Sequence, residues 1–521
     1  MPILPRQQPD EIARRALGHL EQVVAIDSAS DERSPTLPST VGQAKLSEHL
    51  AGFFSELGAS VERDANANLV ASFAGRGAAA GAAPLALLIH LDTARGTRAV
   101  ERLDAVPGWD GRTVAYPANP RLEVAVANYP SLTAFVGQTL LHGPGDAPFG
   151  LDDKLGLCHL MTLAWLLREN PDVAHPPLIF VGRPDEEIAR MAAVKGLAEL
   201  LAERGVRSGY TIDGIEPYEI NVANFNGSRG SVWFTPQPGS APQWPAFTLT
   251  LGGVNTHGAT AKAEGHRPAT RLGAELLACL ASRGLVGESV VVASFASDTL
   301  RDCDAELTVY VRDDGARAAL SAALDEIVGP HVPRGASWKL EPAATRPAPD
   351  AAVHALLTFV ARFLASAPGF VLAAEDSAGW EGYSQPYRAL ADDRGLRLDV
   401  RLRDFDEAGM ARRCQHLRQV AAGLPVEIEV QYVNMGPKLA QRPELAEWAK
   451  RAGEAVGVET RVLPIRGGTG VDPFLERGVA LANLGTGYFA PESEKELTTL
   501  ELMAGHAGWL FALVQGVGGD G

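Results

Sequence analysis

The chain has 521 residues, of which 46% are apolar and 21% charged, the composition of an ordinary globular protein. This length exceeds what one hydrophobic core normally supports, so two or more domains are expected. The 47 basic and 63 acidic residues give a formal net charge of −16, which argues against nucleic acid and anionic membranes as partners.

The cysteines and the start of the chain predict a cytoplasmic protein. The four cysteines, at positions 158, 279, 303 and 414, have no paired spacing and are expected to be reduced thiols. The first ten residues lack the apolar core of an export signal. The longest apolar stretch, residues 155–167, is too short to span a bilayer.

Helices and strands alternate along the first 213 residues. Apolar spacing predicts a helix at residues 11–26, strands at residues 68–73 and 85–91, and a buried helix at residues 155–167. A Gly/Ala-rich flexible connection is expected at residues 74–84. The alternation predicts an α/β fold with a mixed, largely parallel sheet and helices on both faces.

The pattern changes after residue 215. Half-buried strands are predicted at residues 232–234, 246–251 and 306–311, and the chain then returns to a helix at 444–456 and an apolar strand at 479–484. We infer a split catalytic domain, residues 1–218 and 434–521, interrupted by an inserted α+β lid domain, residues 219–433.

An internal repeat lies inside the inserted domain. Residues 309–313 (VYVRD) match residues 400–404 (VRLRD), with an offset of 403 − 312 = 91 residues. A helix is predicted after each copy, at residues 316–327 and 408–421. Two chance Arg-Asp strand ends are the alternative, but the shared order of strand, Arg-Asp and helix favours an internal duplication.

Three predicted strands end in residue types that bind metal ions. Open α/β folds bind ligands at the carboxyl ends of their strands. One imidazole with several carboxylates and no thiolate suits one or two divalent ions of the zinc, manganese or cobalt kind. The residues concerned are His90 and Asp92 after the first strand, Asp152 and Asp153 before a helix, Asp185, Glu186 and Glu187 after the second strand, and Asp213 after the third.

Each of these residues also has an ordinary explanation when taken alone. A histidine at a strand end is commonly a satisfied core or surface residue. The helix dipole favours Asp152 and Asp153 at a helix start without any metal. An acidic run is usually a solvated turn, and Asp213 can begin a turn with Gly214. Their order and spacing together favour a two-metal hydrolase.

The motifs, taken in order, resemble the co-catalytic dizinc peptidase superfamily that includes peptidase T, aminoacylases and carnosinase-like dipeptidases. The resemblance covers most of the chain and is closest to peptidase T. The segments that carry it are HLDTA (90–94), GQTLL (137–141), GLDDK (150–154), PDEE (184–187), YTIDG (210–214), NFN (224–226), HGATAK (257–262), EGY (381–383), RDFD (403–406), QYVNM (431–435) and PIRGGT (464–469).

The resemblance implies a cytoplasmic dinuclear metallopeptidase that cleaves a terminal amide bond of di- or tripeptides. Its cofactors would be two divalent metal ions, zinc or alternatively manganese or cobalt. The metal ligands would include His90, Asp152 as the bridge, Glu187 and Asp213. Glu186 would be the general base, Asp92 would orient His90, and His257 would stabilise the oxyanion. Substrate contacts would come from Asn255, Arg403, Arg466, Gly468 and Thr469.

The chain departs from the family near its C-terminus, where members have a histidine ligand. No histidine lies between His416 and His506. If Glu496 matches the acid that follows the family's histidine, Glu492 stands in the histidine's place. An oxygen ligand is acceptable to zinc and suits manganese, so we expect Glu492 to bind metal. A solvated acidic loop beside a weakened second metal site is the alternative.

Two further departures concern Gly470 and the lid. Thr469 is followed by Gly470, whereas peptidase T has Asp-Gly there. The lid is longer than that of peptidase T by roughly one repeat unit. Monomeric relatives with a doubled lid imitate the partner subunit of dimeric relatives, so a monomer is expected, with a dimer as the alternative.

Two other functions compete with the peptidase. One is an amidohydrolase or deacylase acting on N-acyl amino acids or other small amides. The other is a pseudoenzyme that binds metal or peptide after losing its last histidine. The complete set of His90, Asp92, Asp152, Glu186, Glu187 and Asp213 argues against the pseudoenzyme.

Overall fold

The computed structural model describes residues 2–258, 260, 264–297, 303–366 and 382–517, and the chain divides into two compact units. The first unit consists of Met1–Asn119, Ala125–Asn224 and Val433–Gly521, and the second of Pro120–Val124 and Phe225–Tyr432. Ala259, Ala261, Lys262 and Glu381, which belong to the motifs above, lie outside the described residues.

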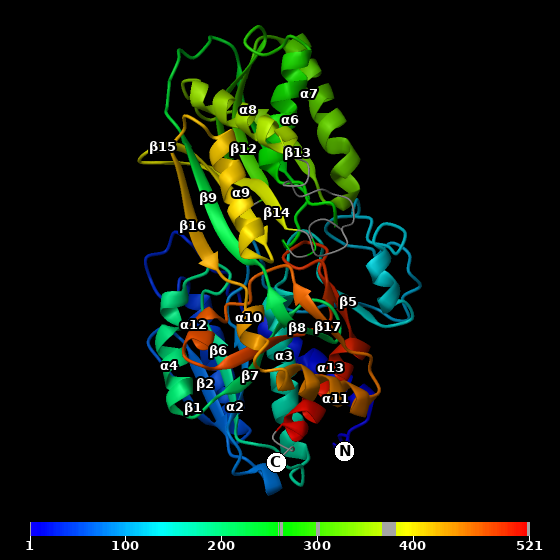
Figure 1. Ribbon diagram of the computed structural model, residues 1–521. Helices are drawn as coiled ribbons and strands as arrows, with labels where there is room; N and C mark the ends of the chain where they lie inside the picture. The colour runs from blue at the N-terminus through cyan, green and yellow to red at the C-terminus, as the bar shows by residue number, and fades with distance from the viewer. Residues whose placement is uncertain (1, 259, 261–263, 298–302, 367–381, 518–521) are drawn as a thin grey trace. The chain divides into compact units, whose positions relative to one another are not determined.

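The first unit is built on a mixed sheet of eight strands, in the order β1-β2-β6-β3-β7-β18-β8-β17 (Figure 1). The four central strands, β6, β3, β7 and β18, run parallel, which confirms the predicted sheet. Every residue of β3 and β6 is buried, as the apolar runs in their sequence require. The strands are β1 (Ser60–Arg63), β2 (Leu69–Phe73), β3 (Leu85–His90), β6 (Leu178–Arg183), β7 (Ser208–Gly214), β8 (Glu219–Asn224), β17 (Arg461–Ile465) and β18 (Ala480–Gly485).

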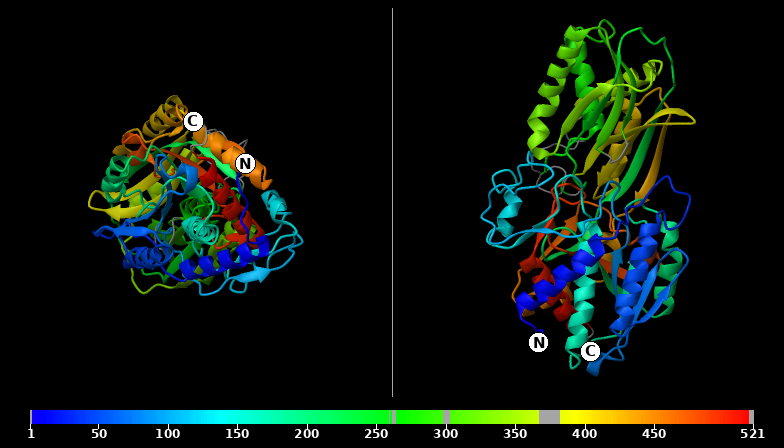
Figure 2. Two further views of the ribbon diagram at one scale, coloured as in Figure 1. Left: turned by 90° about the horizontal axis from the view of Figure 1, so that it is seen from below. Right: turned by 180° about the vertical axis from the view of Figure 1, so that it is seen from behind.

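Helices flank this sheet. Helix α1 packs against α3 and α13, and α3 lies on β3 and β7 (Figure 2). Helix α2 lies on β1 and β2, while α12 lies on β18 and packs against α4. These helices are α1 (Pro9–Val24), α2 (Val41–Glu56), α3 (Leu151–Glu169), α4 (Lys195–Glu203), α10 (Gly436–Leu439), α11 (Glu444–Val456), α12 (Asp472–Glu476) and α13 (Leu500–Gly516). Among the described helices, none combines the length and apolar character needed to cross a bilayer.

A small second sheet in this unit has the order β19-β20-β5-β4. Its strands are β4 (Asp104–Val106), β5 (Leu140–His142), β19 (Tyr488–Phe489) and β20 (Leu497–Thr499). Glu492 lies in the turn between β19 and β20. The antiparallel pairing of these two strands therefore fixes the ends of the segment that carries this predicted ligand.

Strand β8 belongs to the first unit, although an inserted domain was expected to begin at residue 219. The reason is its pairing, because β8 runs parallel to β17 and antiparallel to β18 in the first sheet. The chain therefore passes from the first unit to the second after Asn224 and returns to the first unit after Tyr432.

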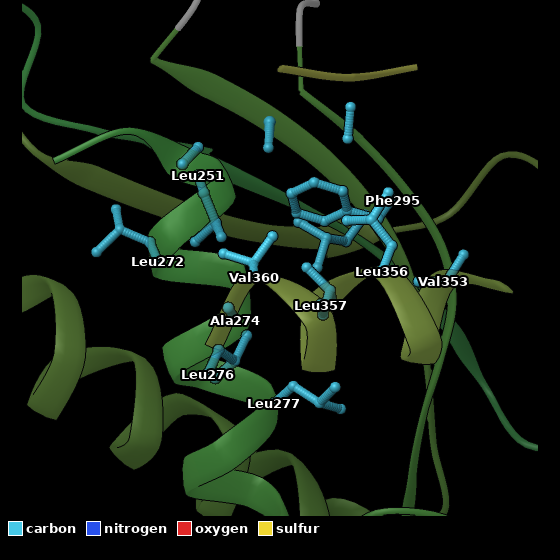
Figure 3. Packing of buried hydrophobic residues seen from close by; sticks show 14 of the residues in the cluster. Leu251, Leu272, Ala274, Leu276, Leu277, Phe295, Val353, Leu356, Leu357 and Val360 are labelled. Atoms are coloured by element: carbon cyan, nitrogen blue, oxygen red, sulfur yellow. The ribbon is translucent and has the colours of Figure 1, made fainter. Parts of the chain in front are cut away.

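The second unit is an antiparallel sheet of eight strands, in the order β13-β10-β12-β11-β14-β15-β9-β16. Its helices and strands share one apolar cluster, in which Leu356 of α8 lies beside Phe295 of β11 (Figure 3). The strands are β9 (Asn226–Phe234), β10 (Ala246–Gly252), β11 (Val290–Ser297), β12 (Asp304–Val311), β13 (Ser337–Pro342), β14 (Tyr383–Asp392), β15 (Gly395–Asp404) and β16 (Val426–Tyr432). The helices are α6 (Ala269–Ser282), α7 (Asp314–Val328), α8 (Ala351–Ser366) and α9 (Glu407–Val420).

The strand order of the second unit is that of two equivalent halves joined edge to edge. The series β10-α6-β11-β12-α7-β13 forms one half, and β9-α8-β14-β15-α9-β16 forms the other with the same relative order of strands. The halves meet where β11 pairs with β14 at Ser297 and Ala389. The repeated segments, residues 309–313 and 400–404, lie at the ends of β12 and β15, which hold the same place in their halves.

Candidate metal centre

The carboxyl ends of three neighbouring strands bring the predicted ligands of the first unit together. His90 ends β3, Asp213 lies near the end of β7, and the Glu186–Glu187 turn follows β6. Nε2 of His90 lies 3.0 Å from Oδ1 of Asp152 and 3.3 Å from Oδ1 of Asp213. Ligand atoms of His90, Asp152 and Asp213 all lie within 4.8 Å of one another, which is close enough for one metal ion to bind all three.

Asp152 and Asp153 do not have helical backbone angles, although α3 includes both. Their φ and ψ are −87° and 106°, and −113° and 31°, and the peptide bond between them is cis. Gly150 holds the N-cap position, so a capping role does not account for either aspartate. The Asp153 carboxylate instead accepts a hydrogen bond from the backbone N–H of His90 at 3.2 Å.

The buried Asp92 carboxylate fixes the acidic turn after β6. Oδ1 accepts a hydrogen bond from the N–H of Glu186 at 2.9 Å, and Oδ2 accepts one from the N–H of Glu187 at 3.0 Å. On the other side, Nδ1 of His90 lies 2.9 Å from the backbone oxygen of Asp92 and 3.5 Å from its Oδ1. The sequence did not predict the two hydrogen bonds that Asp92 accepts from the backbone of Glu186 and Glu187.

Glu187 carries a buried oxygen, Oε1, that has no hydrogen-bond partner within the described part of the chain. Burial, followed by repulsion from Glu492 and Asp152, raises the pKa of Glu187 well above its usual value. Ligand atoms of Asp152 and Glu492 lie within 4.8 Å of each other. A cluster of carboxylates around an unsatisfied buried oxygen is a costly arrangement that a divalent cation would stabilise, so these residues fit a metal ion.

Glu496 connects the Glu492 segment to the loop that carries Asp152. Its Oε2 accepts hydrogen bonds from the N–H groups of Phe149 and Gly150 at 2.8 Å each, and from Leu151 at 3.3 Å. Its Oε1 accepts a hydrogen bond from the N–H of Glu492 at 3.0 Å. Burial raises the pKa of Glu496 to about 8 in spite of the three hydrogen bonds to Oε2, which lower it.

His90 and Asp213 both hold a proton more strongly than usual. Burial raises the pKa of Asp213 to about 7, although His90 opposes this shift. Burial alone would lower the pKa of His90, but attraction to Asp213 and hydrogen bonds to Asp152, Asp213 and Asp92 raise it well above the usual value. Deprotonating this cluster without a cation is therefore unfavourable in the folded protein.

The metal-free protein is predicted to lose stability as the pH rises from about 4 to about 8, because the usual pKa values of Asp213 and Glu496 lie near 4 and their folded pKa values are about 7 and about 8. A group with a raised folded pKa contributes stability that is complete below its unfolded pKa and is lost as the pH rises through its folded pKa. A divalent cation favours the deprotonated ligands, so the loaded protein should show a weaker or reversed dependence. Thermal unfolding with and without a chelator measures this. Equal pH dependence in both states would contradict the prediction.

The predicted substrate-binding residues fall in both units. Arg466, Gly468 and Thr469 follow β17 in the first unit, with Thr469 buried. In the second unit, Asn255 and His257 lie between β10 and α6.

Arg403 lies in β15 of the second unit and is buried. Its Nη1 donates to the backbone oxygens of Ser228 and Leu402, and its Nη2 donates to Oε1 of Gln431, all at 3.0 Å. These contacts lie within its own sheet.

Arg183 is a member of the site that sequence reasoning did not select. It is the last residue of β6 and is 1% exposed. Its Nη2 lies 3.6 Å from Oδ2 of Asp213 and 3.7 Å from Oε1 of Glu186. An arginine at the end of an apolar run is ordinarily read as a surface residue. Its position directly between a buried strand and the acidic turn was the one available signal.

Comparisons with known proteins agree with this architecture. No family model matches the chain. It is 31% identical to peptidase T of Desulfitobacterium hafniense strain Y51 over 212 residues, 40% of this chain and half the length of that relative. A longer match, 23% identical over 478 residues, covers 89% of this chain and of peptidase T from Halothermothrix orenii. The fold is similar to that of a tripeptidase from Staphylococcus aureus, with a TM-score of 0.51, 15% identity and coverage of 96% of this chain and 98% of that one.

Proposed function

Because the chain belongs to the peptidase T-like metallopeptidase superfamily, we propose that it is a metal-dependent hydrolase that cleaves a terminal amide bond of di- and tripeptides. The observation that carries this proposal is the convergence of His90, Asp152 and Asp213 beside the unsatisfied oxygen of Glu187. Buried titratable groups that crowd together in this way are typical of functional sites.

The donor set suits two divalent ions that share one carboxylate. His90 and Asp213 would hold one ion and Glu187 and Glu492 the other, with Asp152 common to both, since its ligand atoms lie within 4.8 Å of those of His90 and Asp213 and of Glu492. When bound, the ions would polarise the amide carbonyl and acidify a water molecule. One imidazole among several carboxylates is compatible with zinc, and also with manganese or cobalt.

Glu186 is the proposed general base. Its side chain is 16% exposed, so it can reach a water molecule, whereas Oε1 of Glu187 is buried without a hydrogen-bond partner in the described part of the chain. Asp92 accepts hydrogen bonds from the backbone N–H groups of both glutamates and so fixes the backbone from which their side chains extend. The Glu186 carboxylate would take a proton from the attacking water and return it to the leaving amine. The roles that the resemblance implies for Asn255, His257, Gly468 and Thr469 stay predictions.

Peptides with a free amino terminus are the predicted substrates, and their N-acetylated forms are predicted to be poor ones. The relatives named peptidase T and the structure named a tripeptidase support this choice over the amidohydrolase. Rates for matched free and N-acetylated tripeptides measure the difference. A clearly faster acetylated series would replace the peptidase with the amidohydrolase.

The substrate carboxylate is predicted to bind Arg466. Arg403 is the second candidate, but three of its hydrogen bonds are already made within its own sheet. Replacing Arg466 by leucine should raise KM about tenfold or more for peptides with a free carboxylate, because a charged hydrogen bond is lost. KM for the matched C-terminal amides should change little. If KM for the free-carboxylate peptides rises selectively in Arg403→Leu instead, Arg403 is the residue that binds the substrate carboxylate.

The protein is predicted to be active as a monomer. The two halves of the second unit pair through β11 and β14 within a single chain, which fits the doubled lid that the family resemblance associates with a monomer. Analytical ultracentrifugation at the assay concentration measures the mass. An obligate dimer under those conditions would overturn the prediction.

A further inference from the structure

We propose that Arg183 is a positioning residue that joins the turn at Thr469 and Gly470 to the general base Glu186. The proposal rests on the proposed function, since it assigns Arg183 a role in that reaction. Arg183 is 1% exposed, so it cannot itself bind a peptide. Its effect must therefore pass through the groups that it contacts.

The first of these contacts is with the backbone of the turn. Nη1 of Arg183 donates to the backbone oxygen of Gly470 at 2.7 Å, and Nη2 donates to that of Thr469 at 2.9 Å. The two terminal nitrogens of a planar guanidinium thus hold two successive carbonyl groups, which fixes both the place and the orientation of the turn. Thr469 ends the segment that begins at Arg466, the predicted carboxylate-binding residue.

Gly470 shows how closely the guanidinium approaches this turn. Its φ is +57°, a conformation that side chains disfavour. A Cβ atom at this position would lie 1.9 Å from Nη1 of Arg183 and 2.7 Å from Oε1 of Glu186. The absence of a side chain at residue 470 therefore allows the turn, the guanidinium and the base carboxylate to meet.

The second contact is electrostatic. A buried guanidinium keeps its charge and is stable only when opposite charges and acceptors surround it. Here Glu186 lies 3.7 Å away and Asp213 3.6 Å away, beyond hydrogen-bond distance from Nη2. The positive charge attracts the Glu186 carboxylate without engaging it in a direct hydrogen bond. Glu186 is thereby held near the turn while its oxygens stay available to a water molecule.

These two contacts predict separable effects. Losing the hydrogen bonds to the turn should raise KM, because the segment from Arg466 to Gly470 is no longer held. Losing the charge should lower kcat, because Glu186 is no longer held for proton transfer. Lysine keeps the charge but cannot reproduce the two-pronged contact, whereas methionine keeps neither.

The experiment compares Arg183→Lys, Arg183→Met and Gly470→Ala with wild type. Arg183→Met is expected to lower kcat about a hundredfold and to raise KM about tenfold. Arg183→Lys should recover most of kcat and leave KM raised. Gly470→Ala should raise KM, because its Cβ displaces the guanidinium from the turn.

Arg442→Met is the matched control. Arg442 also supports backbone in the first unit, by donating to the oxygen of Arg207 at 2.9 Å, but it contacts Ser208 at the opposite end of β7. Its loss should change stability without changing kcat or KM.

Hydrogen exchange of residues 466–471 supplies a readout that does not depend on activity. Exchange there should accelerate in Arg183→Met and not in Arg442→Met. The proposal is overturned if kcat and KM of Arg183→Met both stay within about twofold of wild type. It is also overturned if Arg183→Lys and Arg183→Met have the same kcat and neither variant changes hydrogen exchange at residues 466–471. A wild type that binds metal but cleaves no peptide would refute the proposed function, and the exchange result would still decide whether Arg183 holds the turn.

Discussion

Replacing Glu186 by glutamine is expected to lower kcat by about three orders of magnitude while metal content stays unchanged. The reason is that the amide keeps the size of the carboxylate but cannot accept a proton. Glu186 is placed for this role because Asp92 fixes its backbone N–H at 2.9 Å and its side chain remains partly exposed. Steady-state kinetics on a tripeptide, with metal content measured for each preparation, give the result.

Glu199→Gln is the control for this variant. Glu199 lies on α4 in the same unit and pairs with Arg477, with both side chains about half exposed. Its substitution should leave turnover unchanged. Near wild-type turnover in Glu186→Gln, with full metal content, would remove Glu186 from the mechanism and leave the base unassigned.

Removing the Glu492 carboxylate is expected to change the metal-free and metal-loaded proteins in opposite directions. Burial and then repulsion from Glu492 raise the pKa of Glu187, so Glu492→Ala should lower that pKa part of the way toward its usual value. Near neutral pH the metal-free protein should then become more stable, because less repulsion opposes ionised Glu187. Metal binding should weaken about a hundredfold or more, because a ligand is lost.

Two further variants make the test of Glu492 specific. Glu492→His should retain metal binding, because imidazole can serve as a ligand at the same place. Glu454→Ala, on the exposed face of α11, should change neither metal affinity nor metal-free stability. Calorimetric metal titration and thermal unfolding measure both effects. An unchanged titration for Glu492→Ala would identify the segment as an ordinary acidic turn.

The parts of the fold that the sequence predicted are those set by local patterns. Strands β3 and β6 are buried along their whole length, so their apolar runs identified them. Because β3, β6 and β7 are parallel neighbours, residues at their carboxyl ends had to meet, and His90 and Asp213 do. The match between residues 309–313 and 400–404 likewise corresponded to equivalent strands, β12 and β15.

The features that were missed depend on contacts between distant segments. Glu496 contacts the loop at residues 149–151 across more than 340 positions of sequence, which no local pattern records. The inserted domain was expected to begin at residue 219, yet the pairing of β8 with β17 and β18 places this strand in the first sheet. Arg183 was not selected from the sequence, because its burial and its contacts with the Thr469–Gly470 turn depend on segments that are distant in the chain.

Metal titration with simultaneous measurement of hydrolysis tests the central claim most directly. The protein is stripped with a chelator, and zinc or manganese is added in steps while cleavage of a free tripeptide is followed. The donor set predicts no hydrolysis in the stripped protein and full activity once two ions are bound for each chain. Undiminished hydrolysis in the stripped protein, or no hydrolysis of any peptide at full metal loading, would contradict the account.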